Sequence, residues 1–243
     1  MNLNAIIQPQ QASDPGFVHP AKRLVIVIDG PAGAGKSTVA KLLASRLGLL
    51  YLDSGALYRA LAWKVCQRKI DPTDHPAVIS LLSSTSVKLE QAIGGGLVFV
   101  DGQDVTADIR TPQVSEVSSK VSVIPEVREW LLPLQRELAV RGGVVGDGRD
   151  LGTRVFPDAA VKFFLEADLE TRATRRLDEL HRNGHQGLSF EQVCQEVLTR
   201  DQRDQSRAIA PLEAAPDASR IDTSRLTVDE VVDRLMSVVR ARL

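Results

Sequence analysis

The stretch GPAGAGKS, residues 30–37, combines glycines with one lysine and one hydroxyl in the spacing G-x-x-x-x-G-K-[ST]. In this pattern the glycines let backbone N–H groups turn toward phosphate oxygens, and the start of a helix adds a partial positive charge. Lys36 can then reach the β- and γ-phosphates, and the Ser37 hydroxyl can ligate Mg²⁺. These residue types indicate a site for a nucleoside triphosphate, but they do not show how its γ-phosphate is used.

A second charged stretch, GVVGDGRDLGT, spans residues 143–153. It places Asp147, Arg149 and Asp150 among four glycines, directly after a short apolar run. By itself the stretch fits either a solvated turn or a site whose glycines leave room for a ligand. Both interpretations stay open at this point.

Two more stretches carry arginines in positions that could meet an anion. In LDSGALYR, residues 52–59, Tyr58 and Arg59 follow a strand end, where open α/β folds bind ligands. The same pattern fits equally well a tyrosine packed in the core beside an arginine on the surface, with no ligand bound. In TRDQRDQSRAIAPL, residues 199–212, three arginines share one helical face, which is also the pattern of a solvated, salt-bridged helix. These three are Arg200, Arg203 and Arg207, with Asp204 between them.

The abrupt stop at AIAP favours the anion-binding interpretation of that helix, because it would hold the last arginine at a helix end facing a cleft. The preceding helix adds to the positive charge. Its arginines are Arg172, Arg175 and Arg176. Two basic helices of this kind are the composition expected of a lid that closes over triphosphate charge.

The elements that must position these residues follow an alternating pattern. Leu24–Ile28 is a continuous apolar run typical of a strand buried on both faces, and apolar spacing after it predicts a helix. Leu49–Asp53 predicts a second strand, and a second helix follows. The order strand, helix, strand, helix predicts an α/β domain with a parallel sheet.

Beyond about residue 71 the pattern changes. Two short strands around Gly94–Gly96 predict a hairpin inserted into the alternation, followed by a helix at about 127–140 and a strand at GGVVGD. An apolar strand is expected at 161–167, with charged helices at 169–183 and 190–207. A short strand at RIDTS and a terminal helix that begins after Thr227 complete the chain.

Composition narrows the function classes. The 243 residues are 43% hydrophobic, enough for a buried core, and 30 basic against 31 acidic side chains give a net charge of −1. Balanced charge and 4% aromatic residues argue against nucleic acid as a partner. The two cysteines, Cys66 and Cys194, have no metal-ligand spacing, and no apolar run could span a bilayer. We expect a cytoplasmic monomer with no membrane partner, in which residues 1–22 form a disordered leader.

Taken together and in order, the motifs resemble the bacterial cytidylate kinase family. They are GPAGAGKST, LDSGALYR, IRTPQVSEVSSKVSVIPEVRE, GDGRDLGTRVFPDA and RDQRDQSRAIAPL. The resemblance implies a P-loop three-layer α/β/α fold with a central parallel sheet, a monophosphate-binding insert and a helical lid. Residues 23–243 would form a single kinase domain, with the monophosphate-binding region at about 54–125 and the lid at about 168–206. It also implies that ATP, with Mg²⁺, phosphorylates CMP and dCMP.

The resemblance also implies roles for single residues. The ATP site would comprise Gly30, Pro31, Ala32, Gly33, Ala34, Gly35, Lys36, Ser37 and Thr38. The CMP site would comprise Ser54, Tyr58, Arg59, Ser119, Arg128, Arg149, Asp150, Arg200, Asp204 and Arg207. Ser119, Arg128 and Asp150 match positions that contact cytosine, and Arg200 with Asp204 match the sugar site. We expect Lys36, Arg59, Arg149 and Arg207 to act in catalysis by neutralising charge. Ser37, together with Asp147 directly or through its water shell, would hold Mg²⁺.

Two other functions fit parts of the same pattern. A P-loop kinase for another monophosphate or a small metabolite would share the phosphate-binding motif. A nucleotide-dependent switch would share it too, but the chain has no Asn-Lys pair of the kind a guanine-binding switch needs. The paired anion sites therefore favour a kinase over a switch.

Overall fold

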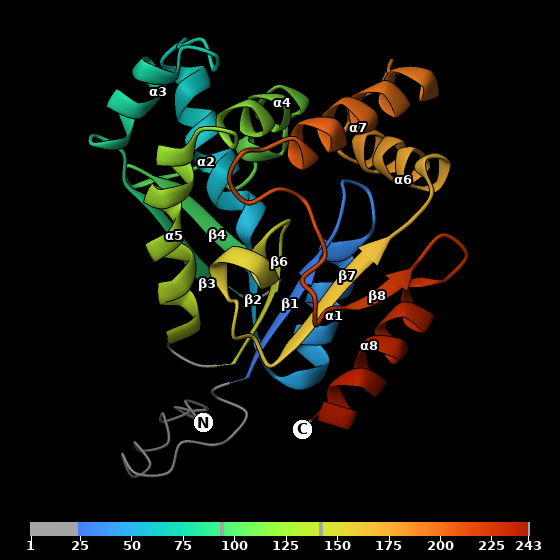
Figure 1. Ribbon diagram of the computed structural model, residues 1–243. Helices are drawn as coiled ribbons and strands as arrows, with labels where there is room; N and C mark the ends of the chain where they lie inside the picture. The colour runs from blue at the N-terminus through green and yellow to red at the C-terminus, as the bar shows by residue number, and fades with distance from the viewer. Residues whose placement is uncertain (1–23, 93–94, 141–142, 243) are drawn as a thin grey trace, which may run out of the picture.

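The computed structural model describes residues 24–92, 95–140 and 143–242 (Figure 1). The leader expected at residues 1–22 lies outside the described residues. No described helix is both long enough and apolar enough to cross a membrane.

A five-stranded sheet lies at the centre of the molecule (Figure 1). Its strand order is β2-β6-β1-β7-β8, and each neighbouring pair is parallel. Since parallel strands end at the same edge, the residues that follow β1, β2 and β6 meet there. The strands are β1 (Val25–Asp29), β2 (Leu50–Asp53), β6 (Val144–Asp147), β7 (Val161–Glu166) and β8 (Ser219–Asp222).

Helices cover both faces of this sheet. On one face α1 (Lys36–Leu47) and α8 (Val228–Arg242) enclose a buried apolar cluster with β1 and β7. On the other face α5 (Pro125–Val140) and the short π-helical turn η3 (Leu151–Val155) pack against β1, β2 and β6. The predicted three-layer α/β/α architecture with a parallel sheet is therefore confirmed.

The link from β1 to α1 depends on glycine. Gly35 precedes α1 with a φ of 85°, in the left-handed backbone region that residues other than glycine rarely adopt. A Cβ atom on Gly30 would lie 2.1 Å from the backbone oxygen of Leu165 in β7. The phosphate-binding loop therefore fits between strand and helix only with glycine at these positions.

Between β2 and β6 the chain forms a region with a separate apolar core. The predicted hairpin is confirmed: β3 (Val87–Ala92) and β4 (Gly95–Val100) are antiparallel, and a short β5 (Gln103–Asp104) extends them. The helical elements of the region are α2 (Ser54–Gln67), α3 (His75–Leu82), the 3-10 turn η2 (Asp108–Arg110) and α4 (Pro112–Val121).

Helices α3 and α4 were not predicted from the sequence. Each starts with a readable signal, because Asp74 and Thr111 cap the first turns through their side chains and a proline lies in each first turn. Both helices are short, at 8 and 10 residues, so their periodicity is weak. Capping chemistry was therefore the better signal here than apolar spacing.

A pair of charged helices, α6 (Leu169–Arg182) and α7 (Phe190–Gln205), lies beyond the carboxyl ends of the strands (Figure 1). The two helices enclose a small apolar cluster. A capping box starts α7, since Ser189 and Gln192 bond to each other's backbone N–H groups. We refer to α6 and α7 as the helical pair.

Candidate active site

A cleft of about 920 Å³ opens at the carboxyl edge of β1, β2 and β6, beneath the helical pair. Of the residues assigned to the ATP, CMP and magnesium sites, all but Gly30 and Pro31 line it. Those two lie at the start of the loop, where the Pro31 carbonyl faces Lys36. Of the other arginines expected to face an anion, Arg175 and Arg176 line it, whereas Arg203 and Arg172 do not and instead pair with Glu116 and Asp201. The structure thus brings the phosphate loop, the stretch after β6 and the α7 arginines together at one site. The roles assigned to single residues remain predictions.

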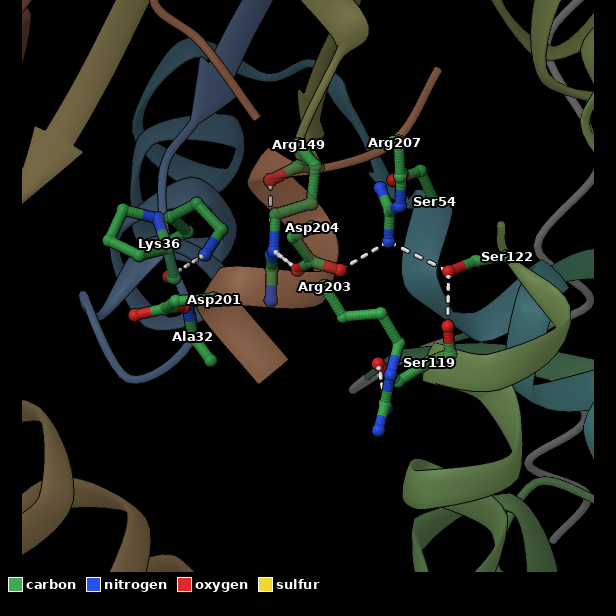
Figure 2. Close-up of polar contacts among 12 residues, drawn as sticks. Ala32, Lys36, Ser54, Ser119, Ser122, Arg149, Asp201, Arg203, Asp204 and Arg207 are labelled. Atoms are coloured by element: carbon green, nitrogen blue, oxygen red, sulfur yellow. Dashed lines mark hydrogen bonds and ion pairs between the residues drawn. The ribbon is translucent and has the colours of Figure 1, made fainter. Parts of the chain in front are cut away.

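Lys36 lies buried at the start of α1, with its ammonium group 2.6 Å from the Pro31 carbonyl oxygen (Figure 2). Burial, with the nearby guanidinium of Arg149, lowers the pKa of Lys36 well below its usual value, against the pull of Asp147. A cation held in this way lacks sufficient counter-charge within the protein. A bound polyphosphate would supply it.

Next to Lys36, the Ser37 hydroxyl donates to one oxygen of Asp147 over 2.7 Å, and the Tyr51 hydroxyl donates to the other over 2.6 Å. Burial raises the pKa of Asp147, and the negative charge of Asp53 raises it further. A buried carboxylate beside a hydroxyl offers the hard oxygen ligands that Mg²⁺ prefers, and Mg²⁺ takes its other ligands from water and phosphate. Ser37 and Asp147 therefore fit a magnesium ion bound to a triphosphate.

On the other side of the cleft, Asp53 at the end of β2 binds two arginines. Arg59 of α2 lies 2.8 Å and Arg110 of η2 2.9 Å from the same carboxylate oxygen, while the other oxygen caps α2 at the Ala56 N–H. Burial opposes ionisation of Asp53, but the two guanidinium groups outweigh it and lower its pKa to about 2. The carboxylate therefore holds Arg59 in place at the cleft wall.

The Asp150 carboxylate forms a buried ion pair with Arg128 of α5. The Arg128 guanidinium also donates to the Ser122 carbonyl oxygen over 3.0 Å and lies 5.4 Å from the centre of the Tyr58 ring. These contacts fix a donor, an acceptor and an aromatic face in the lining of the cleft. Such a group can recognise a planar base by its polar edge.

Asp204 of α7 lies between two arginines (Figure 2). It accepts from Arg149 over 3.0 Å and forms an ion pair with Arg207, whose guanidinium also donates to the Ser122 hydroxyl over 2.7 Å. Although Asp204 is only 1% exposed, these cations keep its pKa below the usual value. The carboxylate thereby draws the end of α7 to the loop after β6.

The strongest sign of an anion site is the set of buried side-chain nitrogens without a hydrogen-bond partner. Within the described residues all of them belong to arginines that line this cleft. Burial and the charge of Arg149 lower the pKa of Arg200 to about 10, so the site holds an excess of positive charge. The five nitrogens are on Arg59, Arg128, Arg176, Arg200 and Arg207.

Three features of the site were not predicted. Arg110 binds the same carboxylate as Arg59, and the hydroxyl of Ser122 binds Arg207. Asp201 accepts from the Ala32 N–H over 3.3 Å and forms an ion pair with Arg172. From the sequence, Arg172 was expected to face the triphosphate instead. Each is a contact between segments distant in the chain, and no local spacing signals such a contact.

The family model and the curated relatives that match this chain name the same family. The family model described as cytidylate kinase matches residues 26–241. A cytidylate kinase of Geobacillus sp. (strain WCH70) is 50% identical over 218 residues, which is 90% of this chain and 97% of that relative. The cytidylate kinase of Caldicellulosiruptor bescii is 47% identical over 217 residues, 89% of this chain and 96% of the relative.

One solved structure, an uncharacterized protein from Eubacterium ventriosum ATCC 27560, aligns with 90% of this chain and 99% of its own. Its TM-score is 0.51 at 14% sequence identity. A likeness at that level supports the fold alone.

Proposed function

The chain belongs to the cytidylate kinase family, and we propose on that premise that it transfers the γ-phosphate of ATP to CMP and dCMP, giving ADP with CDP or dCDP. The single observation that carries the proposal is the group of buried arginine nitrogens without a hydrogen-bond partner, on residues that line one cleft together with Lys36. Two polyanions that repel each other need such a concentration of positive charge in order to bind side by side.

On the donor side, the loop from Gly30 to Thr38 would hold the triphosphate through its backbone N–H groups, and Lys36 would neutralise the β- and γ-phosphates. Ser37 and Asp147, already in contact at 2.7 Å, would hold Mg²⁺. When bound, the metal would supply charge neutralisation at the transferred group.

On the acceptor side, Arg59, Arg149 and Arg207 would hold the monophosphate, with Ser54 beside them. Cytosine presents an amino donor at N4, so the Asp150 carboxylate suits that edge of the base, and Arg128 suits its acceptors. The Ser119 hydroxyl, which accepts from Arg203 over 2.7 Å, would complete this contact. Arg200 and Asp204 would hold the sugar, and Tyr58 would pack beside the base.

The reaction needs no general base. The second pKa of a phosphate monoester is about 6, so the acceptor oxygen is largely ionised at neutral pH. That oxygen attacks the γ-phosphorus, the bond to the bridging oxygen of ADP breaks, and the leaving oxygen keeps the electron pair. None of the described histidines lines the cleft, consistent with catalysis by positioning and charge neutralisation.

The helical pair would act as the lid. Asp201 of α7 joins it to the phosphate loop, because one carboxylate oxygen accepts from the Ala32 N–H and the other pairs with Arg172 of α6. Closure over the two nucleotides would exclude water and so limit simple hydrolysis of ATP. We further propose a monomeric cytoplasmic enzyme that has neither a nucleic-acid nor a membrane partner.

The experiment that tests the function measures ADP release from ATP and Mg²⁺ with CMP, dCMP, UMP, AMP and shikimate in turn. We expect strong stimulation by CMP and dCMP. Stimulation by shikimate or AMP alone would instead assign the chain to the kinases of another acceptor. If no acceptor stimulates release, the transferase proposal is wrong.

A further inference from the structure

Asp29 is the last residue of β1 and directly precedes the phosphate loop. Only 4% of the residue is exposed, and its two carboxylate oxygens accept from consecutive backbone N–H groups. Oδ1 accepts from Leu151 over 3.0 Å, and Oδ2 accepts from Gly152 over 2.8 Å. The proposed reaction gives this buried carboxylate no part.

These bonds hold one end of the segment that carries Arg149 and Asp150. The other end is held by the same strand, because Gly148 donates its N–H to the Ile28 carbonyl oxygen over 3.1 Å. Arg149 and Asp150 thus lie between two attachments to the end of β1. The acceptor side of the cleft is fixed to the strand that leads into the donor side.

The packing leaves this segment little freedom. A Cβ atom on Gly152 would lie 3.2 Å from the side chain of Lys162, 3.3 Å from Val27 and 3.4 Å from the Asp29 carboxylate. A side chain would have little room there, so the backbone at Gly152 lies directly against Val27 and the Asp29 carboxylate. The Asp29 bonds therefore act at the point where the segment meets β1, and their loss would release the backbone that follows Arg149 and Asp150.

We propose that Asp29 is a positioning residue for the acceptor site, which sets Arg149 and Asp150 against CMP by holding the Leu151 and Gly152 N–H groups. It touches neither nucleotide in this scheme. The inference rests on the proposed function only in taking Arg149 and Asp150 as acceptor contacts. Substitution of Asp29 should therefore impair the use of CMP more than the binding of ATP.

The charge of Asp29 supports this role. Burial raises its pKa to about 7, although the N–H groups of Gly152 and Leu151 favour the ionised form. Of the charged groups that face it, Asp150 adds to the rise and Lys36 opposes it. Protonation removes an acceptor lone pair from one oxygen, so one of the two bonds weakens. Because the ionised form of Asp29 holds the segment best, its contribution to kcat/KM for CMP should increase as the pH rises through 7.

The first test is Asp29→Asn, which keeps the shape but turns one of the two acceptors into a donor. One buried N–H then faces an NH₂ group, an arrangement that lowers kcat/KM for CMP by about 10- to 100-fold. The KM for CMP should rise, while the dissociation constant of ATP, measured by calorimetry, changes by less than about threefold. Asp158→Asn, an exposed carboxylate in the same connection, is the matched control and should behave as the wild type.

The second readout is the pH profile. The titration of CMP itself, near pH 6, is common to both enzymes and cancels in the ratio of wild-type to variant kcat/KM. We expect this ratio to rise between pH 6 and 8 with a midpoint near 7. If Asp29→Asn does not fold, Asp29→Ser removes the carboxylate and leaves space for water, and it is measured in the same way.

Two outcomes overturn the proposal. One is a variant as active toward CMP as Asp158→Asn. The other is an equal loss for both nucleotides with a pH-independent ratio, which would make Asp29 a structural residue only. Failure of the proposed function is distinct from both, because the wild type would then show no activity with CMP.

Discussion

The phosphate loop presents backbone N–H groups from consecutive residues, whereas the acceptor side of the cleft collects charged side chains from α2, α5, α7 and the segment after β6. In the loop, glycine and the helix start provide the binding geometry. On the acceptor side, three carboxylates hold arginines in place: Asp53 binds Arg59, Asp150 binds Arg128, and Asp204 lies between Arg149 and Arg207.

This difference shows two ways of keeping an anion site ready for its ligand. A backbone site needs no counter-charge, because its partial charges are fixed by the fold. A site built from arginines must offset their mutual repulsion, and buried acids do so before the ligand arrives. We therefore expect the acceptor side to be more sensitive than the phosphate loop to the loss of single charges and to pH. Lys36 is the exception, because it is the one charged side chain of the loop.

The largest effect is expected at that lysine. Lys36→Ala removes the one side chain of the loop that carries a full charge to the transferred phosphate. We expect kcat to fall by at least about 10²- to 10³-fold, with little change in the thermal midpoint, since burial of an ammonium group without sufficient counter-charge contributes no stability. Steady-state kinetics and thermal unfolding measure the two quantities. Near-normal turnover would contradict the assignment of the phosphate loop.

The second test separates the two sides of the cleft. Arg128→Ala leaves the Asp150 carboxylate without its partner and removes a contact proposed for cytosine. We expect kcat/KM for CMP to fall by about 10- to 100-fold, while ATP binding measured by calorimetry changes little. Arg154→Ala, which removes an exposed arginine paired with Glu129, is the control. An equal loss for both nucleotides would mean that Arg128 supports the fold and not the acceptor site.

The third test concerns a contact that joins the helical pair to the phosphate loop. Asp201→Asn weakens the contacts to Arg172 and to the Ala32 N–H, so the lid should open more readily. We expect a several-fold increase in ATP hydrolysis without CMP and a KM for ATP raised by a similar factor. Glu191→Gln, an exposed residue in the first turn of α7, is the control. Unchanged hydrolysis would show that Asp201 does not hold the lid.

The same comparison explains what the sequence could predict. The phosphate loop could be predicted from the sequence because its glycines and its lysine lie close together in the chain. The parallel sheet could be predicted from the buried apolar runs. The arginines of α7 were found by helical spacing, but their partners were not. Asp53 binds Arg110, Ser122 binds Arg207 and Asp201 binds the Ala32 N–H, and each pair is brought close only by folding. Asp29 directly precedes the phosphate loop, but its partners are more than a hundred residues away.

The smallest effect tests whether acceptor-side charge pairs depend on pH. Since the pKa of Asp53 is lowered to about 2, its pairing adds stability that is complete above its unfolded pKa of about 4 and is lost as the pH falls from about 4 to about 2. Arg110→Ala removes one of its two partners. Because the Arg110 side chain is 41% exposed and screened by water, the free energy of unfolding should fall by only about 1 kcal/mol or less. Urea unfolding at pH 6 and at pH 2.5 should show the full difference at the higher pH and a clearly smaller one at the lower, where Asp53 begins to be protonated. An equal difference at both values would mean that Arg110 stabilises the fold by packing, and that the acceptor side depends less on its charge pairs than the comparison implies.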